Sequence, residues 1–252
     1  MNHRRQALAL IAATLLVPLP KAGVAATLGE NLGGLFSGPK GRLSVLLVDT
    51  TGSIAADDWQ LYERAAKSLF ETARPGDRIV IARVSDRPAS RFLAHADHSF
   101  TAQGNSMHDQ VRARHVRTAA LADFGALRSD KAGGASATLL LDAVMASGEF
   151  LAQGRSRGQS LQLLVLSDMI EESPVVNFAR EAVTPALASR VIDGQRARRL
   201  LPDLAGVQVH VVGAGGRDAA HMARVRDFWL AYFAATGAKV QGYGRAVGTL
   251  SP

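Results

Sequence analysis

Short apolar runs alternate along this chain with longer amphipathic stretches, and this alternation constrains the fold more than any other feature. Four runs are predicted to be strands: Leu43–Val48, Arg78–Val84, Leu161–Leu166 and Val207–Val212. They are apolar nearly throughout or rich in β-branched residues, as expected for strands covered on both faces of a sheet. Strands that alternate with helices predict an α/β protein with a doubly wound, mostly parallel sheet and helices on both faces.

The stretches between these runs carry apolar residues at helical spacing. The predicted helices are Ala56–Ala73, Thr138–Leu151 and Asp218–Ala235, with Gly237 as a C-terminal cap. Pro174–Leu201 is also predicted to be helical, with a break or bend near Pro185 and Asp193-Gly194. Two shorter strands are expected at Arg91–Phe100 and Lys239–Tyr243. The polar segment 101–134 has helical potential over Met107–Leu127 and no readable function.

The first 26 residues have the features of a secretory signal peptide. A basic segment, residues 1–5, precedes an apolar stretch from Ala7 to Pro20. Small residues then precede a cleavage site placed after Ala26. A membrane-spanning helix needs roughly 20 apolar residues, whereas this stretch is shorter and contains two prolines. We therefore expect a periplasmic or secreted protein with no stable membrane span after cleavage, and an uncleaved anchor is the alternative.

The rest of the chain has the size of one α/β domain. We expect a flexible, glycine-rich lead-in over 27–42, a domain over 43–245 and a tail over 246–252. The absence of cysteine excludes disulfides and thiolate chemistry. The formal charge of +7 falls to +4 without the three basic residues at positions 4, 5 and 21. This mild excess, with no aromatic residues among the basic clusters, predicts no nucleic-acid partner.

Oxygen-bearing side chains follow two of the predicted strands. Asp49, Thr51 and Ser53 form an Asp-x-Thr-x-Ser array after the first strand, and Asp168 follows the strand that ends at residue 166. Because ligands gather at the carboxyl ends of parallel strands, Asp49 and Asp168 are expected to lie together. Thr138, at the start of a predicted helix, supplies a further hydroxyl. Two carboxylates and three hydroxyls suit Mg²⁺, Mn²⁺ or Ca²⁺ rather than zinc or copper.

These segments resemble the metal-ion-dependent adhesion site of von Willebrand factor A-type domains, and the resemblance covers most of residues 43–243. Arg74–Ile79 is similar to the family's turn into its second strand. Thr138–Val144 is similar to the family's Thr-Pro-Leu-x-Asp-Ala-Leu helix opening. The resemblance implies a doubly wound α/β fold, Mg²⁺ as the most readily bound ion, and a shift of the last helix that the family allows.

The resemblance also implies a role for each site residue. Thr51 and Ser53 would coordinate the ion directly, and Thr138 directly or through water. Asp49 and Asp168 would act mainly through bound water or hydrogen bonds, and a partner's Asp or Glu would complete the octahedron. This chain departs from the family at Thr51, where the family usually has Ser. Ser136 is an alternative ligand to Thr138.

The function expected from these features is metal-assisted recognition of a protein partner, without catalysis. A metal-independent scaffold or assembly subunit of an envelope or secretion apparatus is the alternative. A haloacid-dehalogenase-like phosphohydrolase would use Asp49 as nucleophile, but Thr51 stands where that class has a second acid. Glu171 and Glu172 either tune the rim of the metal site or precede a helix that starts near Val175.

Overall fold

The computed structural model describes residues 40–52, 54–84, 94–129 and 137–246. The predicted signal peptide and nearly all of the predicted lead-in and tail lie outside the described residues, as do Ser53 and Ser136. All described residues belong to one compact unit of the chain.

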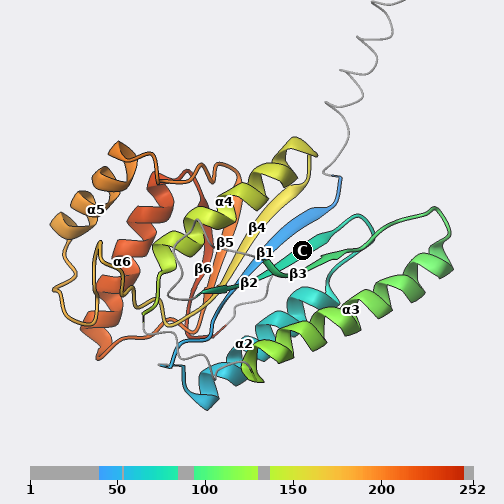
Figure 1. Cartoon of the computed structure of the whole chain (residues 1–252), viewed down its shortest axis with the longest axis horizontal. Coiled ribbons are helices and arrows are strands. Elements are labelled where there is room, and N and C mark those ends of the chain that lie inside the picture. Colours follow the sequence, from blue (N-terminus) through green and yellow to red (C-terminus); the bar gives the residue numbers. More distant parts are fainter. Residues whose placement is uncertain (1–39, 53, 85–93, 130–136, 247–252) are drawn as a thin grey trace, which may run out of the picture. The chain divides into compact units, whose positions relative to one another are not determined.

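Six strands form one sheet at the centre of this unit (Figure 1). They are β1 (Arg42–Asp49), β2 (Arg78–Val84), β3 (Ala94–Ser99), β4 (Ser160–Leu166), β5 (Val207–Val212) and β6 (Lys239–Gly244). Their order is β3-β2-β1-β4-β5-β6, and neighbours run parallel except β2 and β3, which are antiparallel. The sheet therefore grows outward in both directions from β1, and the predicted doubly wound, mostly parallel α/β fold is confirmed.

Within the described residues, five helices cover the two faces of the sheet. They are α2 (Ala56–Glu71), α3 (Ser106–Ser129), α4 (Leu140–Ser156), α5 (Pro185–Ala197) and α6 (Ala219–Ala235). Figure 1 shows α2 and α3 on one side of the sheet and the other three on the opposite side. In β1, Leu46 and Val48 pack into the first layer, whereas Val45 and Leu47 pack into the second. Burial on both faces explains why this strand is apolar at nearly every position.

The segment predicted as one bent helix, 174–201, differs from the prediction. Residues 174–184 form turns, and the helix α5 begins only at Pro185. Thr184 caps it by accepting a hydrogen bond from the Leu187 N–H at 3.1 Å, and proline is tolerated at the first helical position, where the N–H has no partner. Gly194 lies inside α5 and does not end it. Consequently no helix starts near Val175, and the interpretation of Glu171 and Glu172 as residues that precede such a helix is wrong.

The predicted cap of α6 is confirmed. Gly237 has a φ angle of 80°, its N–H donates to Ala234 O, and the Ala238 N–H donates to Phe233 O, both at 3.1 Å. These two bonds make a Schellman motif, which closes the last turn and releases the chain toward β6. The sequence of α6 also predicts an apolar stripe of five residues. Four of them are buried and Met222 is exposed; the buried ones are Val225, Trp229, Tyr232 and Phe233.

A glycine at the entry to β1 carries a testable steric requirement. Gly41 has a φ angle of 90°, and a Cβ added to it would overlap the Gly76 carbonyl. We expect Gly41→Ala to lower the free energy of unfolding by about 2–3 kcal/mol, because backbone strain and a steric clash add. Gly158→Ala is the matched control, since it has a φ angle of 70° and open space, and should cost about 1 kcal/mol. Equal costs in denaturant unfolding would contradict this packing.

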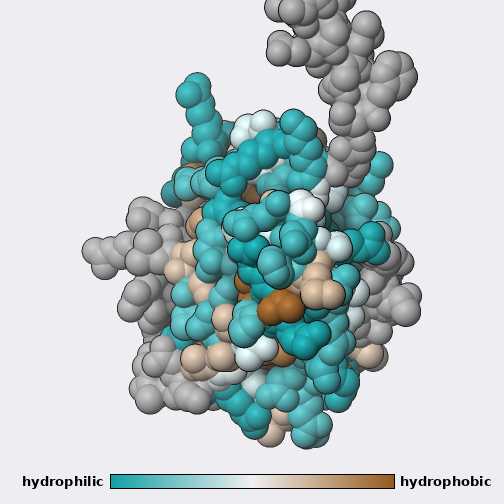
Figure 2. Space-filling model, turned by 90° about the vertical axis from the view of Figure 1, so that its right-hand side faces the viewer, coloured by the Kyte–Doolittle hydropathy of each residue, from teal (hydrophilic) through white to brown (hydrophobic). Residues whose placement is uncertain are grey.

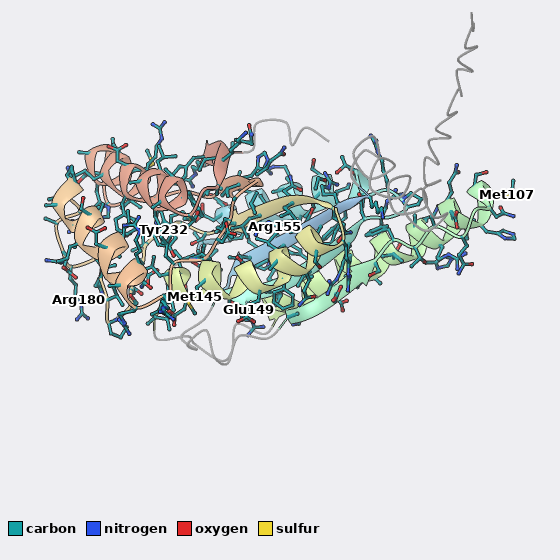
Figure 3. All side chains as sticks on the ribbon, turned by 90° about the horizontal axis from the view of Figure 1, so that it is seen from above. Met107, Met145, Glu149, Arg155, Arg180 and Tyr232 are labelled. Atoms are coloured by element: carbon teal, nitrogen blue, oxygen red, sulfur yellow. The ribbon has the colours of Figure 1, made fainter. Side chains whose placement is uncertain are left out.

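Among the described residues, few large apolar side chains are exposed. They are Met107, Val111, Leu121, Val175 and Met222. Figure 2 shows a face that is mostly hydrophilic with a small hydrophobic area, and Met107 lies at the free end of α3 (Figure 3). Within the described ranges, no helix combines the length and the apolar character needed to cross a membrane.

Candidate metal site

The candidate site lies where the strand order reverses. β1 and β4 are neighbours, but β1 connects to β2 on one side and β4 connects to β5 on the other. Asp49 is the last residue of β1, and Asp168 follows the end of β4 by two residues. Thr138 lies just before α4, in the segment that leads to β4. The carboxyl ends of these strands therefore bring Asp49 and the Asp168 loop side by side, as the sequence predicted.

Asp49 organises the hydroxyl groups around it. Its Oδ1 accepts hydrogen bonds from the Thr51 N–H at 3.0 Å and from the Thr51 hydroxyl at 2.7 Å. Its Oδ2 accepts a hydrogen bond from the Ser167 hydroxyl at 2.8 Å. The side chain is fully buried. Both carboxylate oxygens are thus engaged in holding neighbouring groups, which agrees with an indirect role for Asp49 through hydrogen bonds.

The hydroxyls of Thr51 and Thr138 come together from distant segments. The Thr138 hydroxyl donates to Thr51 Oγ1 at 3.2 Å, and both side chains are buried. Adjacent ligands of an octahedral ion with bonds of about 2.1 Å lie about 3 Å apart. The two oxygens therefore have the spacing of neighbouring ligands, and the donor set fits a hard divalent cation. The methyl group of Thr51 is accommodated in this arrangement.

The loop that carries Asp168 is held by its own backbone and by two other segments. Asp168 Oδ1 accepts a hydrogen bond from the Ile170 N–H at 2.9 Å, and the Asp168 carbonyl accepts one from the Gly215 N–H at 3.0 Å. Met169 adopts a φ angle of 67°, which is unusual for a residue with a side chain. Its carbonyl accepts a hydrogen bond from Trp229 Nε1 at 2.9 Å. The conformation of this loop therefore depends on α6 and on the segment after β5.

Burial dominates the electrostatics of Asp49. It raises the pKa of the Asp49 carboxyl, while the hydrogen bonds from Thr51 and Ser167 oppose the rise and the charge of Glu172 adds to it. Among the described residues, no basic side chain forms an ion pair with Asp49. A buried carboxylate without a counter-charge is costly, and a divalent cation nearby would favour its charged form.

Glu171 has a position that the sequence interpretation missed. It is fully buried, and its Oε2 accepts a hydrogen bond from the Leu141 N–H at 2.9 Å. It therefore caps α4, whose own N-cap residue Leu139 makes no side-chain cap. The next residue, Glu172, donates its N–H to the Thr138 carbonyl at 2.9 Å. These contacts join the Asp168 loop to the Thr138 segment. Glu171 and Leu141 are 30 residues apart in the sequence, so no local sequence pattern could have predicted their contact.

Every predicted ligand role stays a prediction, and two of the named residues have no described position. Ser53 and the alternative ligand Ser136 lie outside the described residues. Across the part of the chain that the structure describes, no three His, Cys, Asp or Glu side chains gather as a group able to hold an ion. The candidate site therefore depends on hydroxyl oxygens as well as on its two carboxylates.

No family model and no curated protein matches this sequence. Solved structures resemble its fold. A von Willebrand factor type A protein from Catenulispora acidiphila is 12% identical with a TM-score of 0.40, and the match covers 81% of this chain and 39% of that one. The PilB minor pilin from Streptococcus sanguinis is 12% identical with a TM-score of 0.49, and the match covers 82% and 58%. The chain thus spans less than two thirds of either structure, and likeness at this level concerns the fold alone.

Proposed function

We propose that this protein is an exported binding module of von Willebrand factor A type, which recognises a protein partner through a divalent cation, most readily Mg²⁺. One observation carries the proposal. Buried oxygens form a continuous hydrogen-bonded chain at the switch point of the sheet, from Ser167 through Asp49 and Thr51 to Thr138. Buried polar groups are costly, and this chain contains a carboxylate with no basic partner among the described residues. A cation would supply the missing positive charge.

The residues would divide the work of binding. Thr51 and Thr138, with Ser53 as predicted, would hold the ion through their hydroxyl oxygens. The Thr51 hydroxyl donates its proton to Asp49 at 2.7 Å, so its oxygen would face a cation with lone pairs and not with a proton. The Thr138 hydroxyl donates to Thr51 in this structure and would have to rotate away. A bound cation supplies an electrophilic centre for a carboxylate oxygen of the partner, and such a contact strengthens where water is excluded.

We propose no catalytic activity for this site. A nucleophilic aspartate must expose one carboxylate oxygen to its substrate, whereas Asp49 is fully buried and both of its oxygens accept hydrogen bonds. This argument favours binding over a phosphohydrolase. A metal-independent scaffold remains the competing function, and metal dependence separates the two.

The test is thermal unfolding of the purified protein in chelator and then in millimolar Mg²⁺, Mn²⁺ or Ca²⁺. An ion that binds only the folded state stabilises it by about 2.7 kcal/mol at 100 times its dissociation constant. We expect an upward shift of the midpoint for the wild type and none for Asp168→Ala. Asp193→Ala is the matched control, because Asp193 is an exposed acid of α5 that pairs with Arg196, and it should keep the shift. No shift with any ion would favour the metal-independent scaffold.

A further inference from the structure

A pocket lies at the amino ends of the central strands, at the opposite edge of the sheet from the candidate metal site. It has a volume of about 310 Å³ and is lined by the start of β1, by the segment 72–77 between α2 and β2, and by Ser160 of β4. Arg42 and Asp49 are the first and last residues of β1, so roughly 23 Å of strand separates the two places. The pocket therefore takes no part in the proposed cation site.

Arg42 brings a largely buried guanidinium to this pocket. Its side chain is 13% exposed. Nη2 donates to Thr72 Oγ1 at 3.3 Å and lies 3.7 Å from Asp77 Oδ2, and the guanidinium makes no other hydrogen bond or ion pair with a described residue. A guanidinium has five N–H donors in a planar fork, so those of Nε and Nη1 remain for a ligand. This fork matches the oxygens of a phosphate or a carboxylate.

The acid in the pocket is already engaged. Asp77 Oδ1 accepts a hydrogen bond from the Arg42 N–H at 2.7 Å, and its Oδ2 accepts one from the Arg74 N–H at 2.9 Å. The side chain is 9% exposed, and the Arg42 guanidinium offsets its charge. Asp77 thus holds Arg42 and the turn in place, and any excess charge in the pocket comes from Arg74.

The excess charge around the pocket is positive. Arg74 lines it with an exposed side chain, and no described residue accepts a hydrogen bond from its guanidinium or pairs with it. Lys40 and Arg157 are also exposed. They lie on adjoining backbone, since the Lys40 N–H donates to the Gly158 carbonyl at 3.1 Å. Clustered charges of one sign raise the local concentration of ligands of the opposite sign.

We propose that this pocket binds a small molecule through an oxyanion, a phosphate or carboxylate group held between the guanidiniums of Arg42 and Arg74. Hydrogen bonds between charged groups of this kind are the strong ones. The pocket volume is at the lower end of the range for ligand sites, which leaves room for an organic body beside the anionic group, with Pro75 in the lining as an apolar contact.

The first test is calorimetric titration of the wild-type protein, dialysed free of metal, in a buffer without oxyanions and at fixed ionic strength. The probes are inorganic phosphate, glycerol phosphate and succinate. We expect saturable binding of the phosphates, of succinate or of both. Binding by the phosphates alone identifies a phosphate ester as the ligand class, and binding by succinate alone identifies a carboxylic acid. No binding of any probe up to tens of millimolar would overturn the proposal.

The second test measures the affinity of the best probe for Arg74→Gln. We expect about 10- to 100-fold weaker binding, the usual worth of a hydrogen bond to a charged group. The variant should fold normally, because the Arg74 guanidinium contacts no described partner, and the unfolding midpoint without ligand checks this. Arg180→Gln is the matched control, since it removes an exposed arginine from the turns that follow the carboxyl end of β4 (Figure 3). Equal affinities for Arg74→Gln, Arg180→Gln and the wild type, or equal losses in both variants, would contradict a specific site.

Discussion

Replacement of Trp229 by alanine is expected to lower the free energy of unfolding by about 3–5 kcal/mol, the usual cost of deleting a buried aromatic side chain. Trp229 is fully buried on α6. Its ring packs against Phe228 and Tyr232 with centroids 5.4 and 5.5 Å away. Alanine would leave a cavity among these rings and would also remove the hydrogen bond to the Met169 carbonyl. Denaturant unfolding in chelator measures this change without any contribution from bound ions.

Trp229→Phe separates the two causes. Phenylalanine keeps an aromatic ring in the core but cannot donate, so the Met169 carbonyl loses the partner that lies 2.9 Å away. We expect a loss of about 1–3 kcal/mol, the cost of an unsatisfied buried group. Because Met169 adjoins Asp168, this variant should also weaken Mg²⁺ binding.

For Trp229→Ala, a decrease in the free energy of unfolding of less than about 1 kcal/mol would mean that α6 does not pack as described.

The stability of the protein is expected to fall as the pH rises from about 5 to about 8. Burial raises the pKa of Glu171 from 4.5 to about 8, against the opposing hydrogen bonds from Ser173 and from the backbone of α4. The unfolded chain therefore releases this proton near pH 4.5, while the folded protein retains it up to a pH of about 8. The free energy of unfolding therefore decreases as the pH increases across that window, by up to about 5 kcal/mol in all.

Glu171→Gln should remove most of this slope, because glutamine does not titrate and its carbonyl oxygen can still accept the Leu141 N–H. The variant and the wild type should have similar stability near pH 4.5, and the variant should be the more stable near pH 8. Glu149→Gln is the matched control, since Glu149 is an exposed acid of α4, the helix that Glu171 caps (Figure 3). Parallel pH profiles for wild type and Glu171→Gln would contradict the burial of this carboxyl. Urea unfolding at several pH values supplies the data.

The sequence was sufficient to predict most of the fold, because the signals involved are local. β2 and β5 have the predicted bounds, and α2 begins at the predicted residue, Ala56. A strand covered on both faces is apolar at most positions, and a helix on a sheet is apolar on one side. The cap at Gly237 is equally local, since it satisfies backbone groups within its own turn.

The same kind of reasoning failed over residues 174–184. Helical spacing of apolar residues is present there, but the Ser173 hydroxyl and the Asn177 amide oxygen accept hydrogen bonds from nearby backbone N–H groups. Short polar side chains that bond to the local backbone compete with helix formation. Burial of Val176 and Phe178 against α6 then stabilises the turns.

The site divides in the same way. That Asp49 and the Asp168 loop lie side by side was predictable from the chain, because the carboxyl ends of parallel strands meet at the same edge of the sheet. The partners that hold them were not identifiable: Ser167 on Asp49, Trp229 behind the Asp168 loop, and Glu171 at the start of α4. Periodicity and capping are properties of neighbouring residues and can be recognised in a sequence. Contacts between segments far apart in the chain exist only after the sheet and its helices have packed together.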